Sequence, residues 1–163
     1  MNCRLHWRRV LIGAGVAVWV TLAPGVLLAD PTDEEPTEGA LEPDYAAGRK
    51  AIEAKQWTEA IRLLSSAALR DTRNADIQNY LGYAYRNSGQ MDLAFKHYQR
   101  ALSLNPRHRG AHEYVGEAYL MVRNPQKAEE HLAALQKICL IPCEELDDLR
   151  KKIAEYKAAG GRK

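Results

Sequence analysis

The chain has 163 residues, enough for one modest domain, and its composition resembles neither a low-complexity tail nor collagen. Its formal net charge of +2 depends on Arg4, Arg8 and Arg9, because the part from Asp30 onward holds 20 basic and all 21 acidic residues. Nucleic-acid binding needs a basic surface facing the phosphates, so this near-neutral balance argues against a nucleic-acid partner.

Residues 1–29 have the pattern of an export signal. Arginines precede an apolar run that starts at Val10, and a small-residue site ending at Ala29 meets the acidic Asp30. We expect cleavage after Ala29 and therefore an exported, periplasmic protein. An uncleaved anchor facing the periplasm is the alternative, since the apolar stretch from Val10 to Leu28 has 19 residues and about 20 suffice to cross a bilayer.

Residues 30–42 predict a flexible acidic leader. They are rich in Asp and Glu, contain two prolines and have very few apolar side chains. Such a segment cannot bury enough apolar surface to offset the entropy lost on ordering. Folding is therefore expected to begin near Pro43.

An internal repeat with a period of 34 residues follows. Placing 41–74, 75–108 and 109–142 beneath one another, without a gap, aligns six positions that hold a small residue or a large apolar or aromatic one in each unit. The aligned sets are Ala47, Leu81 and Val115; Gly48, Gly82 and Gly116; Ala51, Tyr85 and Tyr119; Ala60, Ala94 and Ala128; Leu64, Tyr98 and Leu132; Ala67, Ala101 and Leu135. Small residues let two helices approach closely, and Leu or Tyr fills the space between them.

The middle unit shows the pattern most completely. It carries Leu81-Gly82, Tyr85, Ala94, Tyr98, Ala101 and Pro106. On these residues the chain resembles the tetratricopeptide repeat family, in which each unit is a helix A, a tight turn and an antiparallel helix B. The outer units depart from it at Ala51, Thr72 and Leu135, as terminal repeats often do. Over residues 43–142 the resemblance implies an all-α solenoid of about three antiparallel helix pairs.

Helix limits follow from the breakers and caps. We expect helices near residues 43–54, 58–70, 75–88, 92–104, 109–122 and 125–138. Residues 87–90 (Asn-Ser-Gly-Gln) should turn the second pair, and Pro125 suits a first helical position.

Residues 143–158 predict a C-terminal capping helix. Leu146, Leu149, Ile153 and Tyr156 are spaced by three, four and three residues, with acids in the first turn and bases later. A stack of repeats leaves an apolar end exposed, which a helix with one polar face would cover. Residues 159–163 are expected to form a frayed tail.

Patterns typical of catalysis are missing from the sequence. We find no phosphate-binding glycine loop, no nucleophile elbow and no zinc-protease spacing of histidines. His108 and His112 are four residues apart, but Gly110 places the first of them at a turn and no third ligand accompanies them. We therefore predict no metal, no cofactor and no enzymatic activity.

Cys139 and Cys143 flank Pro142 at the junction before the capping helix. Cys3 would leave with the signal, so two cysteines would remain in an oxidising compartment. The turn forced by proline can bring their Cα atoms within the roughly 4.4–6.8 Å that a bridge requires. We predict a structural disulfide that fixes the angle of the capping helix. The alternative is a thiol- or copper-handling accessory factor that acts through these two cysteines.

In the family, helices A line a concave groove, so the resemblance implies a partner-binding surface at the matching positions. The predicted groove residues are Tyr45, Arg49, Asp76, Asn79, Tyr83, Arg86, Glu113 and Glu117, with Ile52, Leu120 and Met121 beside them. Tyrosine and arginine are the types that most often dominate binding energy. Ordinary solvated positions are the alternative.

Family members that clamp the acidic tail of heat-shock chaperones use lysines and asparagines at set groove positions. The matching residues here are Tyr45, Arg49, Tyr80, Gly110 and Tyr114. That clamp is mostly absent, so a chaperone tail is not the expected ligand. We expect a non-enzymatic protein–protein interaction module, a scaffold or assembly factor, that binds a protein or peptide in the periplasm or cell envelope.

Overall fold

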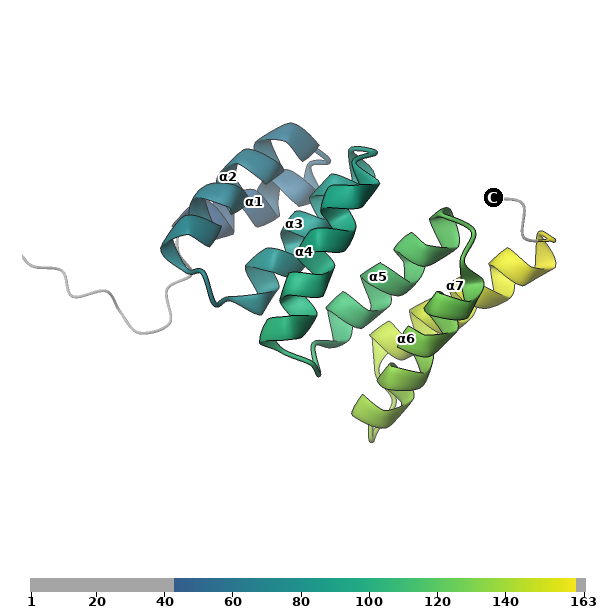
Figure 1. The fold of residues 1–163 in the computed structure, drawn as a ribbon. Coiled ribbons are helices and arrows are strands. Elements are labelled where there is room, and N and C mark those ends of the chain that lie inside the picture. Colours follow the sequence, from purple (N-terminus) through teal and green to yellow (C-terminus); the bar gives the residue numbers. More distant parts are fainter. Residues whose placement is uncertain (1–42, 161–163) are drawn as a thin grey trace, which may run out of the picture. The chain divides into compact units, whose positions relative to one another are not determined.

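The computed structural model describes residues 43–160, which fold into seven helices without a strand. The helices, shown in chain order in Figure 1, are α1 (Pro43–Glu53), α2 (Trp57–Arg70), α3 (Ala75–Asn87), α4 (Met91–Leu104), α5 (Arg109–Met121), α6 (Pro125–Ile138) and α7 (Glu144–Ala158). The first six agree with the predicted limits to within one residue. The expected signal and leader lie outside the described residues. Between 43 and 160, no helix is both long and apolar enough to span a membrane.

Asparagine side chains cap the starts of α3 and α6. The Asn74 side chain accepts hydrogen bonds from the backbone N–H groups of Asp76 and Ile77, which caps α3. Asn124 accepts from the backbone N–H of Lys127 at the start of α6, where Pro125 occupies the first turn. These bonds satisfy donors that have no partner inside the helix.

The turn inside each helix pair has the same backbone shape. Lys55, Gly89 and Arg123, which are 34 residues apart, have φ values of +55°, +81° and +60°. This left-handed conformation suits glycine, because other residues place a Cβ against the backbone there. The repeat therefore extends to the turns, although only the middle unit has the favoured residue.

Three antiparallel pairs, α1 with α2, α3 with α4 and α5 with α6, pack through the predicted small positions. A Cβ built on Gly48 would lie 2.7 Å from the Leu64 side chain, and one on Gly82 would lie 2.6 Å from the Tyr98 ring. Both contacts join a helix A to its own helix B, as the alignment predicts. Only glycine allows so close an approach without displacing the facing side chain.

The third unit differs because α7 packs against both α5 and α6. The atoms nearest to a Cβ on Gly116 belong to Leu149 of α7, at 2.7 Å, and not to the aligned Leu132. Leu146, Leu149, Ile153 and Tyr156 are all buried on this end of the stack. The all-α helix-pair solenoid with a C-terminal capping helix is therefore confirmed, and α7 is an integral part of the third unit.

Candidate functional site

The predicted groove residues lie on one side of helices α1, α3 and α5. We call this surface, together with the α7 residues beside it, the A-helix face. Tyr45, Asn79 and Glu113 hold equivalent repeat positions and are buried, whereas Arg49, Tyr83 and Glu117 are half-buried. Of the remaining predicted residues, Asp76 is exposed and Arg86 is buried. The predicted residues therefore do form one surface, but half of them are buried within the chain itself and are not accessible to a partner.

Arg86 is 7% exposed and its partners come from α5. Its Nη1 donates to Glu117 Oε2 at 2.6 Å and to the backbone carbonyl of Tyr114 at 3.2 Å. The guanidinium also lies over the rings of Tyr83 and Tyr114, 5.0 and 5.5 Å from their centroids. Burial opposes its charge, but Tyr98 and Glu117 raise the pKa of Arg86, so the guanidinium stays charged and ties α3 to α5.

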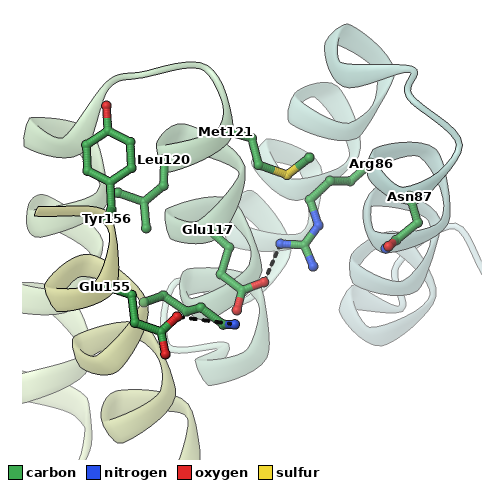
Figure 2. Close-up of a pocket in the computed structure, with 8 residues that line it drawn as sticks. Arg86, Asn87, Glu117, Leu120, Met121, Glu155 and Tyr156 are labelled. Carbon is green, nitrogen blue, oxygen red and sulfur yellow. Dashed lines mark hydrogen bonds and ion pairs between the residues drawn. The ribbon is translucent and has the colours of Figure 1, made fainter. Parts of the chain in front are cut away.

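A mainly apolar pocket of about 280 Å³ opens beside this ion pair. The residues that line this Arg86 pocket come from α3, α5 and α7 and are Arg86, Asn87, Glu117, Leu120, Met121, Lys152, Glu155 and Tyr156 (Figure 2). Met121 is 55% exposed, whereas Leu120 and Tyr156 are buried and close the floor. The pocket therefore offers an accessible apolar surface with charged groups at its edge.

Aromatic contacts join α2 to α3 and α3 to α5. Ring centroids lie 6.1 Å apart for Trp57 and Tyr83 and 4.9 Å apart for Tyr83 and Tyr114. Arg49 of α1 lies over the Tyr80 ring at 5.5 Å. These tyrosine rings already contact guanidinium groups of the chain itself, which is a favourable cation–π arrangement.

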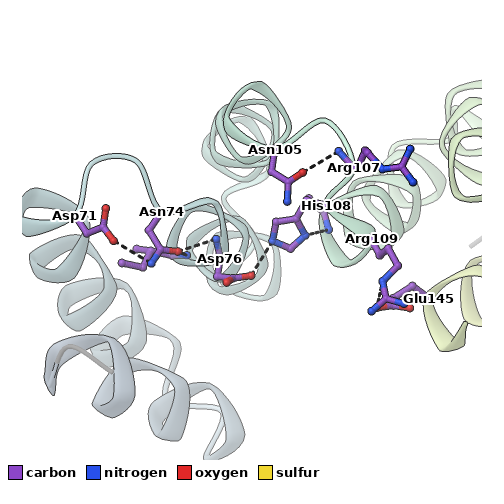
Figure 3. A network of polar contacts seen from close by, with 10 residues as sticks. Asp71, Asn74, Asp76, Asn105, Arg107, His108, Arg109 and Glu145 are labelled. Atoms are coloured by element: carbon purple, nitrogen blue, oxygen red, sulfur yellow. Dashed lines mark hydrogen bonds and ion pairs between the residues drawn. The ribbon is translucent and has the colours of Figure 1, made fainter. Parts of the chain in front are cut away.

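A second pocket, of about 340 Å³, lies where α3, α5 and α7 begin. We call it the acidic pocket, because five of its lining residues are Asp or Glu. It is lined by Asp76, Asn79, Tyr80, His108, Gly110, Glu113, Tyr114, Glu144, Glu145 and Asp148. Two of these carboxylates have partners: His108 Nε2 lies 3.0 Å from Asp76 and Arg109 Nε lies 3.4 Å from Glu145 (Figure 3).

His108 links the start of α5 to Asp76 of α3 at the edge of this pocket. Its Nδ1 accepts the backbone N–H of Ala111 at 3.2 Å and so caps α5. A ring nitrogen that accepts carries no proton, so Nε2 holds it and faces Asp76. The Asp76 pKa is lowered, chiefly by this contact with His108.

Glu113 is 9% exposed and has no hydrogen bond or ion pair within residues 43–160. Burial raises the pKa of Glu113 to about 8, and the nearby acids Glu117, Asp148 and Glu145 act in the same direction. Arg86 opposes the shift, but it is engaged with Glu117. A carboxyl group that resists ionisation at neutral pH is unusual and often marks a functional position.

Two features escaped the sequence reading. The α7 residues Glu145, Asp148 and Lys152 reach the A-helix face, and the only sequence signal was the acidic first turn of that helix. His112 and His131 also face each other, with their Nδ1 atoms 2.9 Å apart. The pairing could have been inferred from their 19-residue separation, which is also that of the bonded pair Gln78 and His97 one repeat earlier.

His112 and His131 are used structurally. His112 Nε2 donates to the backbone carbonyl of Pro106 at 3.1 Å, so its Nδ1 accepts from His131. Burial lowers the pKa of both rings, to about 4 for His131. Within residues 43–160, no group of three or more His, Cys, Asp or Glu side chains is placed to hold a metal ion.

Cys139 ends α6 and Cys143 precedes α7, and the structure joins the two with their Cα atoms 6.0 Å apart. Cys143 is buried with the α7 core, while Leu140 and Ile141 between them are exposed. The bridge therefore links the end of one helix to the start of the next. Whether it persists in the cell stays a prediction.

Comparison with known proteins supports the tetratricopeptide repeat family. The family model "Tetratricopeptide repeat" matches residues 75–108, the same range as the predicted middle unit. The human protein O-mannosyl-transferase TMTC3 is 31% identical over 74 residues, which are 45% of this chain and 8% of that protein. The uncharacterized protein ycf37 of Pyropia yezoensis is 30% identical over 101 residues, 55% of this chain and 56% of that protein. The chain thus spans less than two thirds of either relative.

A solved structure agrees with the fold. The first tetratricopeptide repeat domain of Spaghetti (RPAP3), bound to the HSP90 peptide SRMEEVD, superposes with a TM-score of 0.62 at 20% identity. The match covers 71% of this chain and 91% of that one. At this identity the likeness establishes the architecture of helices α1–α7 and leaves the ligand open.

Proposed function

We propose that this chain is a non-enzymatic interaction module, a scaffold or assembly factor, that binds a polypeptide on its A-helix face. The observation that carries the proposal is the presence of two pockets, of about 280 and 340 Å³, on that one face. Aromatic side chains lie beside charged ones in both, with aliphatic side chains in the Arg86 pocket alone, and such mixed surfaces supply the anchors of protein interfaces. Peptide binding by the structurally similar RPAP3 domain supports the same use of this fold.

The acidic HSP90 peptide of that complex does not suit this chain. The clamp positions hold Tyr80, Gly110 and Tyr114 in place of cationic and amide side chains. Carboxylates line the same end of the face, so an acidic peptide tail would meet like charges.

We further propose that the partner is met after export. The expected signal at residues 1–29 supports a periplasmic location, and a bridge between Cys139 and Cys143 would persist in an oxidising compartment. A thiol- or copper-handling role would need the same cysteines to be reduced. Thiol counting on protein purified from its native compartment distinguishes the two, because a structural bridge leaves no reactive thiol between residues 30 and 163. Two reactive thiols there would favour the thiol role.

Two matched substitutions test the binding face. Met121 in the Arg86 pocket and Leu69 on α2 are both exposed apolar residues, at 55% and 82%. Peptides are first selected from a displayed random library on the purified full chain, and dissociation constants are then measured by fluorescence polarisation. Met121→Asp should weaken binding by about tenfold or more, since it places a charge in an apolar contact. Leu69→Asp should leave binding unchanged. Equal effects of the two substitutions would exclude the A-helix face as the binding site.

A further inference from the structure

The acidic pocket holds more carboxyl groups than the described residues provide with partners. Asp76 and Glu145 have cationic or hydrogen-bonding partners, and Glu144 lies in the first turn of α7, where a carboxylate is stabilised by the helix dipole. Glu113 and Asp148 lie beyond the first turns of their helices and have no hydrogen bond or ion pair within residues 43–160. Two carboxyl groups that line one cavity are thus left without a partner, and a cation between them would favour the ionised form of Glu113.

A buried amide beside them also lacks a partner. Asn79 is 4% exposed, and its Oδ1 makes no hydrogen bond within the described part of the chain. Gly110 leaves room for this side chain, because a Cβ there would lie 3.3 Å from Asn79 Nδ2. A buried acceptor without a donor carries a substantial desolvation cost, which a bound donor would remove.

Three acceptor groups of the pocket lack a donor among residues 43–160. These groups are the Asn79 carbonyl and the carboxyl groups of Glu113 and Asp148, and each can accept a hydrogen bond from an N–H donor. The walls formed by Tyr80 and Tyr114 are aromatic, and each ring already carries an arginine of this chain at 5.5 Å. Aromatic walls with acceptors at the end fit a long aliphatic side chain that ends in a cation.

We propose that the acidic pocket binds a lysine or arginine side chain of the polypeptide partner. The inference rests on the proposed function, because it assigns one contact within the same interface. The cation would approach Glu113, whose ionisation is opposed by burial and by the charges of Glu117, Asp148 and Glu145 and is favoured by Arg86. The bound cation would offset the repulsion among these acids and donate a hydrogen bond to Asn79 Oδ1. Because only a basic side chain can make both contacts, the position of that side chain would fix how the partner aligns along the A-helix face.

The test uses peptides selected on the purified full chain from a phage-displayed random library. The best binder is synthesised with its amino terminus acetylated, which removes the terminal amine as an alternative cation. Each basic residue is then replaced by norleucine, which keeps the aliphatic stem and removes the charge. We expect Lys or Arg to be enriched in the selection, and one such replacement to weaken binding by about tenfold or more.

Two charge-matched variants locate the effect. Glu113→Gln/Asp148→Asn removes the uncompensated carboxylates, while Asp92→Asn/Glu130→Gln removes two exposed acids from α4 and α6. The first variant should bind the basic and norleucine peptides equally, and the second should keep the full difference. Circular dichroism of both variants checks that the helices are intact.

The possible failures are distinct. If no peptide is selected, the proposed function itself is wrong. If peptides bind but basic residues are not enriched, or if the norleucine peptide binds the unmodified chain equally well, the pocket assignment is wrong while the proposed function stands. Persistence of the charge preference in Glu113→Gln/Asp148→Asn would also overturn it, since the cation would then bind elsewhere.

Discussion

The two pockets of the A-helix face differ in how their charges are balanced. In the Arg86 pocket, the buried guanidinium has a carboxylate, a backbone carbonyl and two aromatic rings as partners, all supplied by the chain. In the acidic pocket, Glu113 and Asp148 have no such partner among residues 43–160, and Asn79 Oδ1 is unsatisfied. A charge whose partners all come from the fold contributes to stability. A polar group left without a partner is available to a ligand.

This difference changes the role that we assign to Arg86. The sequence reading places Arg86 among the partner-binding residues because arginine is common in interface hot spots. Its side chain is instead enclosed between α3 and α5, and its Nη1 is engaged with Glu117 and Tyr114. We therefore expect Arg86 to act on binding mainly by fixing how these two helices pack, with Met121 beside it as an accessible contact.

The largest effect is expected for Arg86→Met. The substitution keeps much of the side-chain volume but leaves Glu117 half-buried without its partner, so the free energy of unfolding should fall by about 3 kcal/mol. Urea denaturation followed by circular dichroism measures it. Arg49→Met is the matched control, because Arg49 contacts the Tyr80 ring and has no carboxylate partner within residues 43–160, so its loss should cost less than about 1 kcal/mol. Equal losses would mean that the ion pair with Glu117 is not what stabilises the α3–α5 contact.

Glu113 should make the protein less stable as the pH rises. Its pKa is raised from 4.5 to about 8, so between these values the folded state holds a proton that the unfolded state has released. Stability from this group is fully present below about pH 4.5 and is lost as the pH rises through about 8. Between pH 6.5 and 8 the loss should approach about 2 kcal/mol, at about 1.4 kcal/mol per pH unit.

Glu113→Gln should abolish that decline, because a neutral amide replaces the group that ionises. Urea unfolding at pH 6.5 and 8.0 compares the variant with the unmodified chain. Glu144→Gln removes an exposed acid from the same pocket and should leave the decline in place. A decline that survives in Glu113→Gln would show that another group is responsible.

Most of the fold could be predicted from the sequence because each repeat position has a fixed neighbour. The pairing of Gly82 with Tyr98, for example, follows from the alignment alone. The family match to residues 75–108 supports the same register. The export signal and its cleavage stay predictions, since residues 1–29 lie outside the described part of the chain.

The site was less predictable, because its decisive contacts are not periodic. The capping helix follows no repeat, so its packing angle could not be inferred, and neither could the approach of Asp148 to Glu113. The same angle explains why Gly116 faces Leu149. The hydrogen bond between Arg86 and Glu117 joins residues 31 positions apart in the sequence, on equivalent faces of two repeats. The repeat pattern does not require charged residues to pair there, so this bond could not be predicted.

The smallest effect on stability, and the most direct test of the acidic pocket, is expected for Asp148→Asn. Asp148 is exposed, so its loss should change the free energy of unfolding by no more than about 0.5 kcal/mol. Its charge nevertheless raises the pKa of Glu113, together with burial and the other nearby acids. Removing that charge should lower the Glu113 pKa, which carboxyl carbon chemical shifts in an NMR titration measure directly.

Asp147→Asn provides the comparison, because Asp147 is the preceding residue of α7 and is paired with Arg150. It changes the net charge by the same amount but should leave the Glu113 pKa where it is. A fall in the Glu113 pKa with Asp148→Asn alone would show that α7 brings Asp148 close enough to Glu113 to oppose its ionisation, as expected of two carboxyl groups that line one pocket. An unchanged pKa in both variants would separate the two acids and remove the electrostatic basis for a cation between them.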